Sequence, residues 1–199
     1  MESDWAPTLP HRIDEMIEAY PTRLAVKDGV GHALTYTQFG QRVSDIARAL
    51  LGAGAEEGSS VAVFQHPTAN WVCCLLAIIR IGAIYFPLDL RNPLERLAAI
   101  VKAAQPSAIL VHADTVTLTP GLGGTKAIVI NVSSITMPPL ATSLERVVPN
   151  RARPDSPAVL QFTSGTTGSK YFLKAHLEFV LSPNFHSSEG NDPASCEPS

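Results

Sequence analysis

Residues 60–86 read SVAVFQHPTANWVCCLLAIIRIGAIYF, and this stretch predicts a strand–helix–strand unit. Residues 60–64 form a short run of the kind found in buried strands. Residues 69–81 are apolar nearly all round, which predicts a helix that is itself buried. Residues 83–86 form the next strand. Strands that alternate with helices imply stacked α/β layers.

The alternation extends outward on both sides of this unit. Short apolar runs predict further strands at 24–27, 33–36, 108–111, 127–130 and 158–162. The runs at 108–111 and 127–130 are almost continuously apolar, which is typical of parallel strands covered on both faces. We therefore expect a largely parallel sheet.

Apolar residues at helical spacing predict three further helices. The first spans residues 11–20. Thr37 is the expected N-cap of the second. The third starts after Asn92, which would cap it, with Pro93 at its first position and Glu95 completing a capping box.

The composition excludes several classes of function. Of 199 residues, 45% are hydrophobic, and 15 Lys and Arg against 18 Asp and Glu give a net charge of -3. Because no basic cluster is present, nucleic acid is not an expected partner. The longest apolar run, 71–79, is far shorter than the roughly 20 residues of a membrane-spanning helix, so no membrane partner is expected either. With no secretory signal, and three cysteines that lack metal-ligand spacing, we expect a cytoplasmic protein without a metal site.

The segment Thr163-Ser164-Gly165-Thr166-Thr167-Gly168-Ser169-Lys170 follows the strand predicted at 158–162 and carries the chemistry of the chain. Its glycines allow backbone N–H groups to turn toward an anion, its hydroxyls donate further hydrogen bonds, and its lysine adds positive charge. This composition suits a polyphosphate. Only two residues separate the glycines, so the segment is not a Walker motif. A plain surface turn and an unrelated α/β nucleotide-binding module remain alternatives.

Three stretches together resemble a known family. Residues 162–169 resemble the phosphate-binding signature of the acyl-adenylate-forming enzymes, the superfamily of acyl-CoA synthetases, luciferases and amino-acid adenylation domains. Residues 34–39 resemble the family's early strand-to-helix motif. Residues 79–89 and 92–97 resemble the second core motif of adenylation domains in nonribosomal peptide synthetases. The chain is most similar in character to adenylation domains attached to fungal polyketide synthases.

This resemblance implies the N-terminal part of an adenylation domain, with an α/β fold whose largely parallel sheet is flanked by helices. In the family, ATP and an amino or other carboxylic acid form an acyl-adenylate and pyrophosphate, and the acyl group passes to a carrier protein of the megasynthase. The resemblance implies that ATP with Mg²⁺ binds at Thr163, Ser164, Gly165, Thr166, Thr167, Gly168 and Lys170. The family's proline and second glycine around the lysine are absent here.

The resemblance covers residues 10–169, so we divide the chain into an AMP-binding part, 1–169, and a divergent tail, 170–199. We expect the tail to be disordered, apart from a short helix within 172–181. The family's adenine, ribose and catalytic-lysine motifs are not found, which predicts a truncated domain with no catalytic residue of its own and little activity alone. The alternative is a non-catalytic protein that docks on, or complements, a full synthetase.

Asp89 has Arg91 and Arg96 nearby and could suggest a catalytic site. We interpret it instead as a turn residue that pairs with a cation. Cys73 and Cys74 lie in the middle of the apolar run and are interpreted as core residues rather than reactive thiols.

Overall fold

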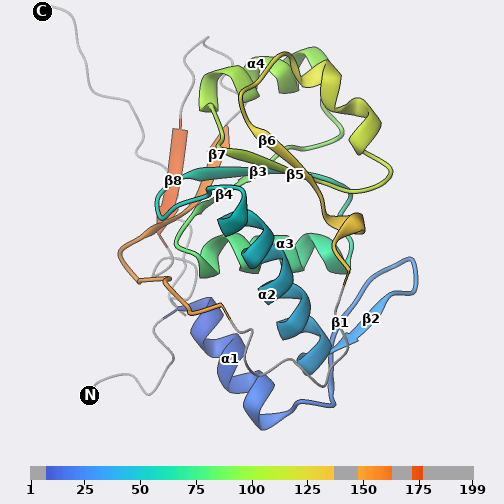
Figure 1. Cartoon of the computed structure of the whole chain (residues 1–199), viewed down its shortest axis with the longest axis vertical. Coiled ribbons are helices and arrows are strands. Elements are labelled where there is room, and N and C mark those ends of the chain that lie inside the picture. The colour runs from blue at the N-terminus through green and yellow to red at the C-terminus, as the bar shows by residue number, and fades with distance from the viewer. Residues whose placement is uncertain (1–7, 137–147, 163–171, 177–199) are drawn as a thin grey trace, which may run out of the picture.

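The computed structural model describes residues 8–136 and 148–162, and the backbone of residues 172–176. Its centre is a six-stranded sheet in the order β6-β5-β3-β4-β7-β8 (Figure 1). The first five strands in this order run parallel, and β8 runs antiparallel to β7. The strands are β3 (Ser60–Phe64), β4 (Ile84–Pro87), β5 (Ala108–Val111), β6 (Ile128–Asn131), β7 (Pro157–Phe162) and β8 (Phe172–His176). The predicted α/β fold with a largely parallel sheet is confirmed.

Helices cover both faces of this sheet (Figure 1). Helices α1 (Leu9–Ala19), α2 (Tyr36–Gly52) and α3 (Ala69–Arg80) lie on one face, and α4 (Leu94–Ala104) lies on the other with the 3-10 helix η1 (Val116–Leu122). A second 3-10 helix, η2 (Val132–Ser134), follows β6. Strands β1 (Leu24–Lys27) and β2 (Ala33–Thr35) pair antiparallel in a separate hairpin.

Strand β3 divides the core in two, because successive side chains of a strand point to opposite faces. Val61 and Val63 pack with α2 and α3, whereas Ala62 and Phe64 pack with α4 and η1. Helix α3 is buried, as its composition predicts. Cys73 and Cys74 are fully buried, and burial raises the pKa of both thiols. They are core residues.

One prediction about the sheet is wrong. The apolar run at 127–130 forms β6, which is the edge strand of the sheet, and the helices do not fully cover its side chains. Ile128 and Val129 remain 47% and 43% exposed. The hydropathy of a strand does not show whether it is central or at the edge, because that depends on which other elements pack against the strand.

The predicted start of the helix after 33–36 is also wrong. Thr35, not Thr37, is the N-cap of α2, and it forms a capping box with Gln38. Gln38 N donates to Thr35 Oγ1 over 3.3 Å, and Thr35 N donates to Gln38 Oε1 over 2.9 Å. The hydroxyl of Thr37 donates instead to the carbonyl of Pro21. The Thr-x-x-Gln spacing of Thr35 and Gln38 is that of a capping box, whereas Gly40 stands three residues after Thr37 and provides no such partner.

The expected capping box of α4 does not form. Pro93 is the N-cap and provides no side-chain hydrogen bond. The side chain of Asn92 donates to the carbonyl of Asp89, so it stabilises the preceding turn rather than the helix.

The helix expected within 172–181 is replaced by strand β8 over Phe172–His176. This strand pairs with β7 in register Gln161↔Leu173 and Phe162↔Phe172. An edge strand presents unpaired backbone groups, and pairing with them outweighs a weak helical preference. Residues 177–199, where disorder is expected, lie outside the described residues.

Asp28 carries a strongly hydrogen-bonded carboxylate in the β1–β2 turn. Its Oδ1 accepts from the N–H of Val30 and of His32, and its Oδ2 accepts from the N–H of Ala69. The His32 ring lies 2.8 Å from Oδ2. Burial acts to raise the pKa of Asp28, but the hydrogen bonds, that of His32 foremost, outweigh it and lower the pKa from 3.8 to about 2.

A depressed carboxyl pKa makes folding stability depend on pH on the acid side. The stabilisation from ionised Asp28 is present above its unfolded pKa and is lost as the pH falls toward the folded value. We therefore expect Asp28→Asn to lose less stability than the wild type between about pH 4 and about pH 2. Urea unfolding at several pH values measures this, with the exposed Glu18→Gln as control. Equal acid slopes for wild type and Asp28→Asn would contradict it.

Candidate functional site

The carboxyl edge of the parallel sheet contains a topological switch point. Strands β3 and β4 are neighbours, yet β3 leads into α3 on one face and β4 leads into α4 on the other. Connections that leave to opposite faces open a crevice at the carboxyl ends of such strands, and ligands of open α/β sheets bind there. On one side of this point, hydrogen bonds close the edge between β3, β5 and β6; on the other side, β4 and β7 line a cavity.

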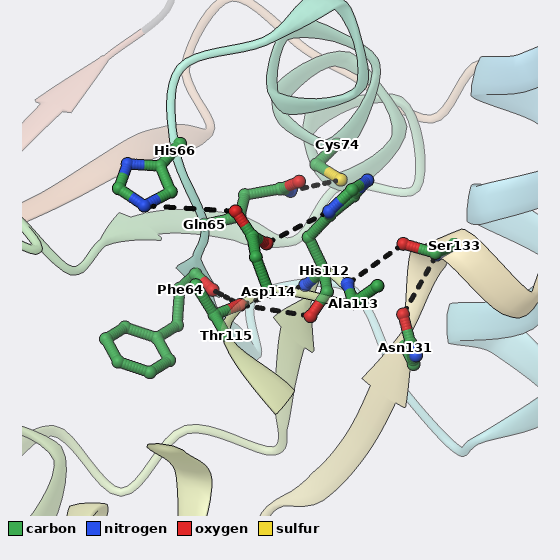
Figure 2. Close-up of polar contacts among 10 residues, drawn as sticks. All are labelled: Phe64, Gln65, His66, Cys74, His112, Ala113, Asp114, Thr115, Asn131 and Ser133. Atoms are coloured by element: carbon green, nitrogen blue, oxygen red, sulfur yellow. Dashed lines mark hydrogen bonds and ion pairs between the residues drawn. The ribbon is translucent and has the colours of Figure 1, made fainter. Parts of the chain in front are cut away.

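The ends of β3 and β5 are joined by side-chain hydrogen bonds (Figure 2). The buried hydroxyl of Thr115 donates to the carbonyl of Phe64 over 2.6 Å and accepts from the N–H of His112 over 3.0 Å. Next to them, the N–H of Ala113 donates to Ser133 Oγ, which ties β5 to the turn after β6. These contacts close this half of the edge.

Two histidines flank Asp114 on the closed half (Figure 2). Nδ1 of His112 lies 3.0 Å from one carboxylate oxygen, and Nε2 of His66 lies 3.8 Å from the other. Within the described residues, no group of three or more His, Cys, Asp or Glu side chains could hold a metal ion. We assign this cluster no catalytic role.

The half of the edge formed by β4 and β7 is open and contains a cavity of about 600 Å³. This volume lies within the ~300–1,000 Å³ of small-molecule sites. Phe86, Leu97 and Phe162 give the cavity an apolar part, and the rings of Phe86 and Phe162 lie 5.6 Å apart. Its polar lining residues are Asp89, Asn92, Arg96 and Gln161.

Asp89 pairs with Arg91 and not with Arg96. Nε of Arg91 donates to both carboxylate oxygens, and Nη2 donates to Oδ2 over 2.8 Å. The N–H of Arg91 also donates to Oδ1. The side-chain hydrogen bonds from Arg91 are the main cause that lowers the pKa of Asp89 to about 2. The interpretation of Asp89 as a turn residue paired with a cation is confirmed.

The predicted phosphate ligands lie outside the described residues. These are Thr163, Ser164, Gly165, Thr166, Thr167, Gly168 and Lys170. The structure does show the residue that precedes them: β7 ends at Phe162, which lines the open cavity. Helix α4 contributes Arg96, Leu97 and Ile100 to this wall. The sequence pointed to Arg96 only as a neighbour of Asp89 and gave no signal that it faces the end of β7.

The model of the AMP-binding enzyme family matches residues 13–170, which is most of the chain. The chain belongs to this family. The match begins within α1, covers every element from β1 to β7 and extends through the hydroxyl-rich segment that follows Phe162.

The chain is also similar to fungal synthetases. The chain is 51% identical over 166 residues to the hybrid PKS-NRPS synthetase mpsA of Macrophomina phaseolina, an alignment that covers 83% of this chain and 4% of that protein. It is 50% identical, with the same coverage, to the hybrid PKS-NRPS synthetase prlS of a fungal species. The chain therefore spans a small part of the length of these relatives.

Solved structures share the fold. The nonribosomal peptide synthetase FmoA3, bound to α-methyl-L-serine-AMP, superposes with a TM-score of 0.76 at 20% identity, over 90% of this chain and 19% of that one. At this identity, the likeness supports the fold alone. Within the described residues, no helix is long and apolar enough to cross a membrane.

Proposed function

We propose that the chain is the N-terminal part of an adenylation domain in a nonribosomal peptide synthetase-like enzyme of secondary metabolism. In the complete domain, ATP and an amino or other carboxylic acid react to acyl-adenylate and pyrophosphate, and a carrier protein then accepts the acyl group. The observation that carries this proposal is the family match, which ends on the phosphate signature directly after β7. Its relatives among the hybrid PKS-NRPS synthetases support the same assignment.

The proposed role of residues 163–168 is to hold the β- and γ-phosphates of ATP. Backbone N–H groups next to glycine and the hydroxyls of Ser and Thr are the donors that a polyphosphate needs. Mg²⁺, when bound, neutralises part of the phosphate charge, and Lys170 adds a further cation. Donors that are in place before the reaction stabilise the charge that develops on the departing pyrophosphate. The cavity beside Phe162 is of a volume that accepts a small-molecule group.

We further propose that the chain alone has little or no activity, because the family's adenine, ribose and catalytic-lysine motifs are not found in its sequence. Amino-acid-dependent ATP–pyrophosphate exchange by the purified 199-residue chain, measured with a pool of twenty amino acids, would contradict this. Co-purification of an inactive chain with a full synthetase would favour the docking alternative.

The signature is tested by a graft. Residues 13–169 replace the corresponding segment of the M. phaseolina synthetase, and amino-acid-dependent ATP–pyrophosphate exchange is measured. We expect exchange by the graft, and a loss of at least about 100-fold in a Thr166→Ala, Gly168→Ala variant, because donors to the phosphates are lost.

The matched control for the graft is Thr117→Ala, Gly29→Ala. Thr117 is exposed, and a Cβ at Gly29 meets no atom within 4 Å, so we expect exchange close to that of the unmodified graft. A folded graft without exchange would contradict the proposed function. Equal exchange by the signature variant and its control would contradict the phosphate assignment.

A further inference from the structure

Among the charged residues that the structure describes in the lining of the open cavity, the guanidinium of Arg96 has no charge partner. Of its charged lining residues, Asp89 is held by Arg91 through both carboxylate oxygens. Arg96, on the first turn of α4, is exposed, and within the described residues it makes no hydrogen bond or ion pair. Of the two charged lining residues, Arg96 is therefore the one whose charge is available to a ligand.

Arg96 and the end of β7 line the same cavity although 65 positions or more separate them in the sequence. Gln161 and Phe162 form the β7 side of its wall, and Arg96, with Asn92 and Leu97, forms the α4 side. The rings of Phe162 and Phe86 are in contact, so the end of β7 lies beside the end of β4. A ligand bound at the carboxyl end of β7 thus has a cation across from it, supplied by a different element.

The chemistry of this cation suits phosphate. A guanidinium stays protonated, and its planar donors match two oxygens of a phosphate group at once. It is also weakly hydrated compared with an ammonium, which lowers the cost of bringing it against a ligand. The adjacent carboxylate of Asp89 repels an anion less strongly because Arg91 offsets its charge.

We propose that Arg96 is a binding residue for the polyphosphate of the nucleotide, reaching it from α4 across the cavity at the carboxyl ends of β4 and β7. The inference rests on the proposed function and adds to it a ligand contact outside the 163–170 segment. Pyrophosphate, as the leaving group or as the end of ATP, presents the same chemistry. A carboxylic acid is the other anion that the cavity could take, and the experiment separates the two.

The test measures binding by calorimetry with the full 199-residue chain at fixed ionic strength. The probes are inorganic pyrophosphate with Mg²⁺, AMP, and benzoate as a small carboxylate. We expect Arg96→Gln to weaken pyrophosphate binding about tenfold and to leave AMP binding unchanged, since a charge-assisted hydrogen bond is lost at one phosphate group. Arg96→Lys should restore part of the affinity. Arg12→Gln, a similar loss of charge on α1, is the control and should change nothing.

Each failure has a distinct meaning. Pyrophosphate affinity that Arg96→Gln leaves intact, while Thr166→Ala, Gly168→Ala abolishes it, overturns the inference and keeps the proposed function. A loss of benzoate binding alone assigns Arg96 to the acid and also overturns the inference. Equal losses of AMP and pyrophosphate affinity also overturn the inference, because they indicate that the substitution weakens binding without acting on the polyphosphate specifically. A wild-type chain that binds neither pyrophosphate nor AMP overturns the inference and the phosphate assignment together. Because Arg96 is exposed and unpaired within the described residues, its variants should melt with the wild type, which circular dichroism checks.

Discussion

Arg80→Ala should lower the free energy of unfolding by about 3 kcal/mol, because it breaks a buried ion pair and leaves its partners unsatisfied. The guanidinium donates to both carboxylate oxygens of Asp14 on α1, over 2.7 and 3.1 Å. Its Nε donates to the carbonyl of Val148 over 2.6 Å. Asp14 is 36% exposed and regains water, so we place the loss at the lower end of the range for buried pairs. Urea unfolding monitored by circular dichroism measures it.

A double-mutant cycle with Asp14→Ala separates the ion pair from the rest of the contact. Asp14→Ala alone should also destabilise the fold, because it leaves the buried guanidinium of Arg80 without its counter-ion, although the bond to Val148 remains. The two losses should not add, since each variant removes the same pair. Arg80→Ala with wild-type stability would show that α1 and the 148–151 segment are not held to α3 by this residue.

Leu110→Ala should cost about 3 kcal/mol, because it empties a site in the core between the sheet and α2 and α3. Leu110 lies in β5 and is fully buried. The cost combines the hydrophobic free energy of the removed side-chain atoms with the free energy of the cavity that remains. Thermal and urea unfolding of the variant measure it.

The matched control is Leu24→Ala in β1. Leu24 is also in a strand, but it is 57% exposed, so its truncation should change the stability by less than about 0.5 kcal/mol. Equal losses at the two positions would be inconsistent with the described core.

The carboxyl edge of the sheet links the fold to the proposed function. Polar contacts tie the ends of β3, β5 and β6 together, whereas the ends of β4 and β7 line a cavity. The phosphate signature follows β7 in the sequence, on the open half. The asymmetry arises because Thr115 and Ser133 provide internal hydrogen-bond partners on one half, whereas Phe86 and Phe162, at the ends of β4 and β7, line the cavity on the other.

Local sequence patterns determined the main helices and strands of this protein and the kind of ligand that the 163–170 segment suits. The apolar run at 69–81 predicts α3, since such a run is best buried, and the runs around it predict parallel strands, because these have a helix on each face. The segment 163–170 indicates polyphosphate from its residue types alone. Each inference depends on residues close together in the chain, where spacing carries the physical information.

Only the tertiary structure decided which strand is at the edge of the sheet and that residues 172–176 pair as a strand. Ile128 is as apolar as Ile109, yet only Ile109 has strands on both sides. Residues 172–176 form a strand because β7 offers an open edge. Arg91, not Arg96, neutralises Asp89, which leaves Arg96 in the cavity beside Phe162. The edge position of β6 and the strand at 172–176 depend on contacts between residues distant in sequence. The Thr35–Gln38 cap and the Asp89–Arg91 pair are local contacts, three and two residues apart.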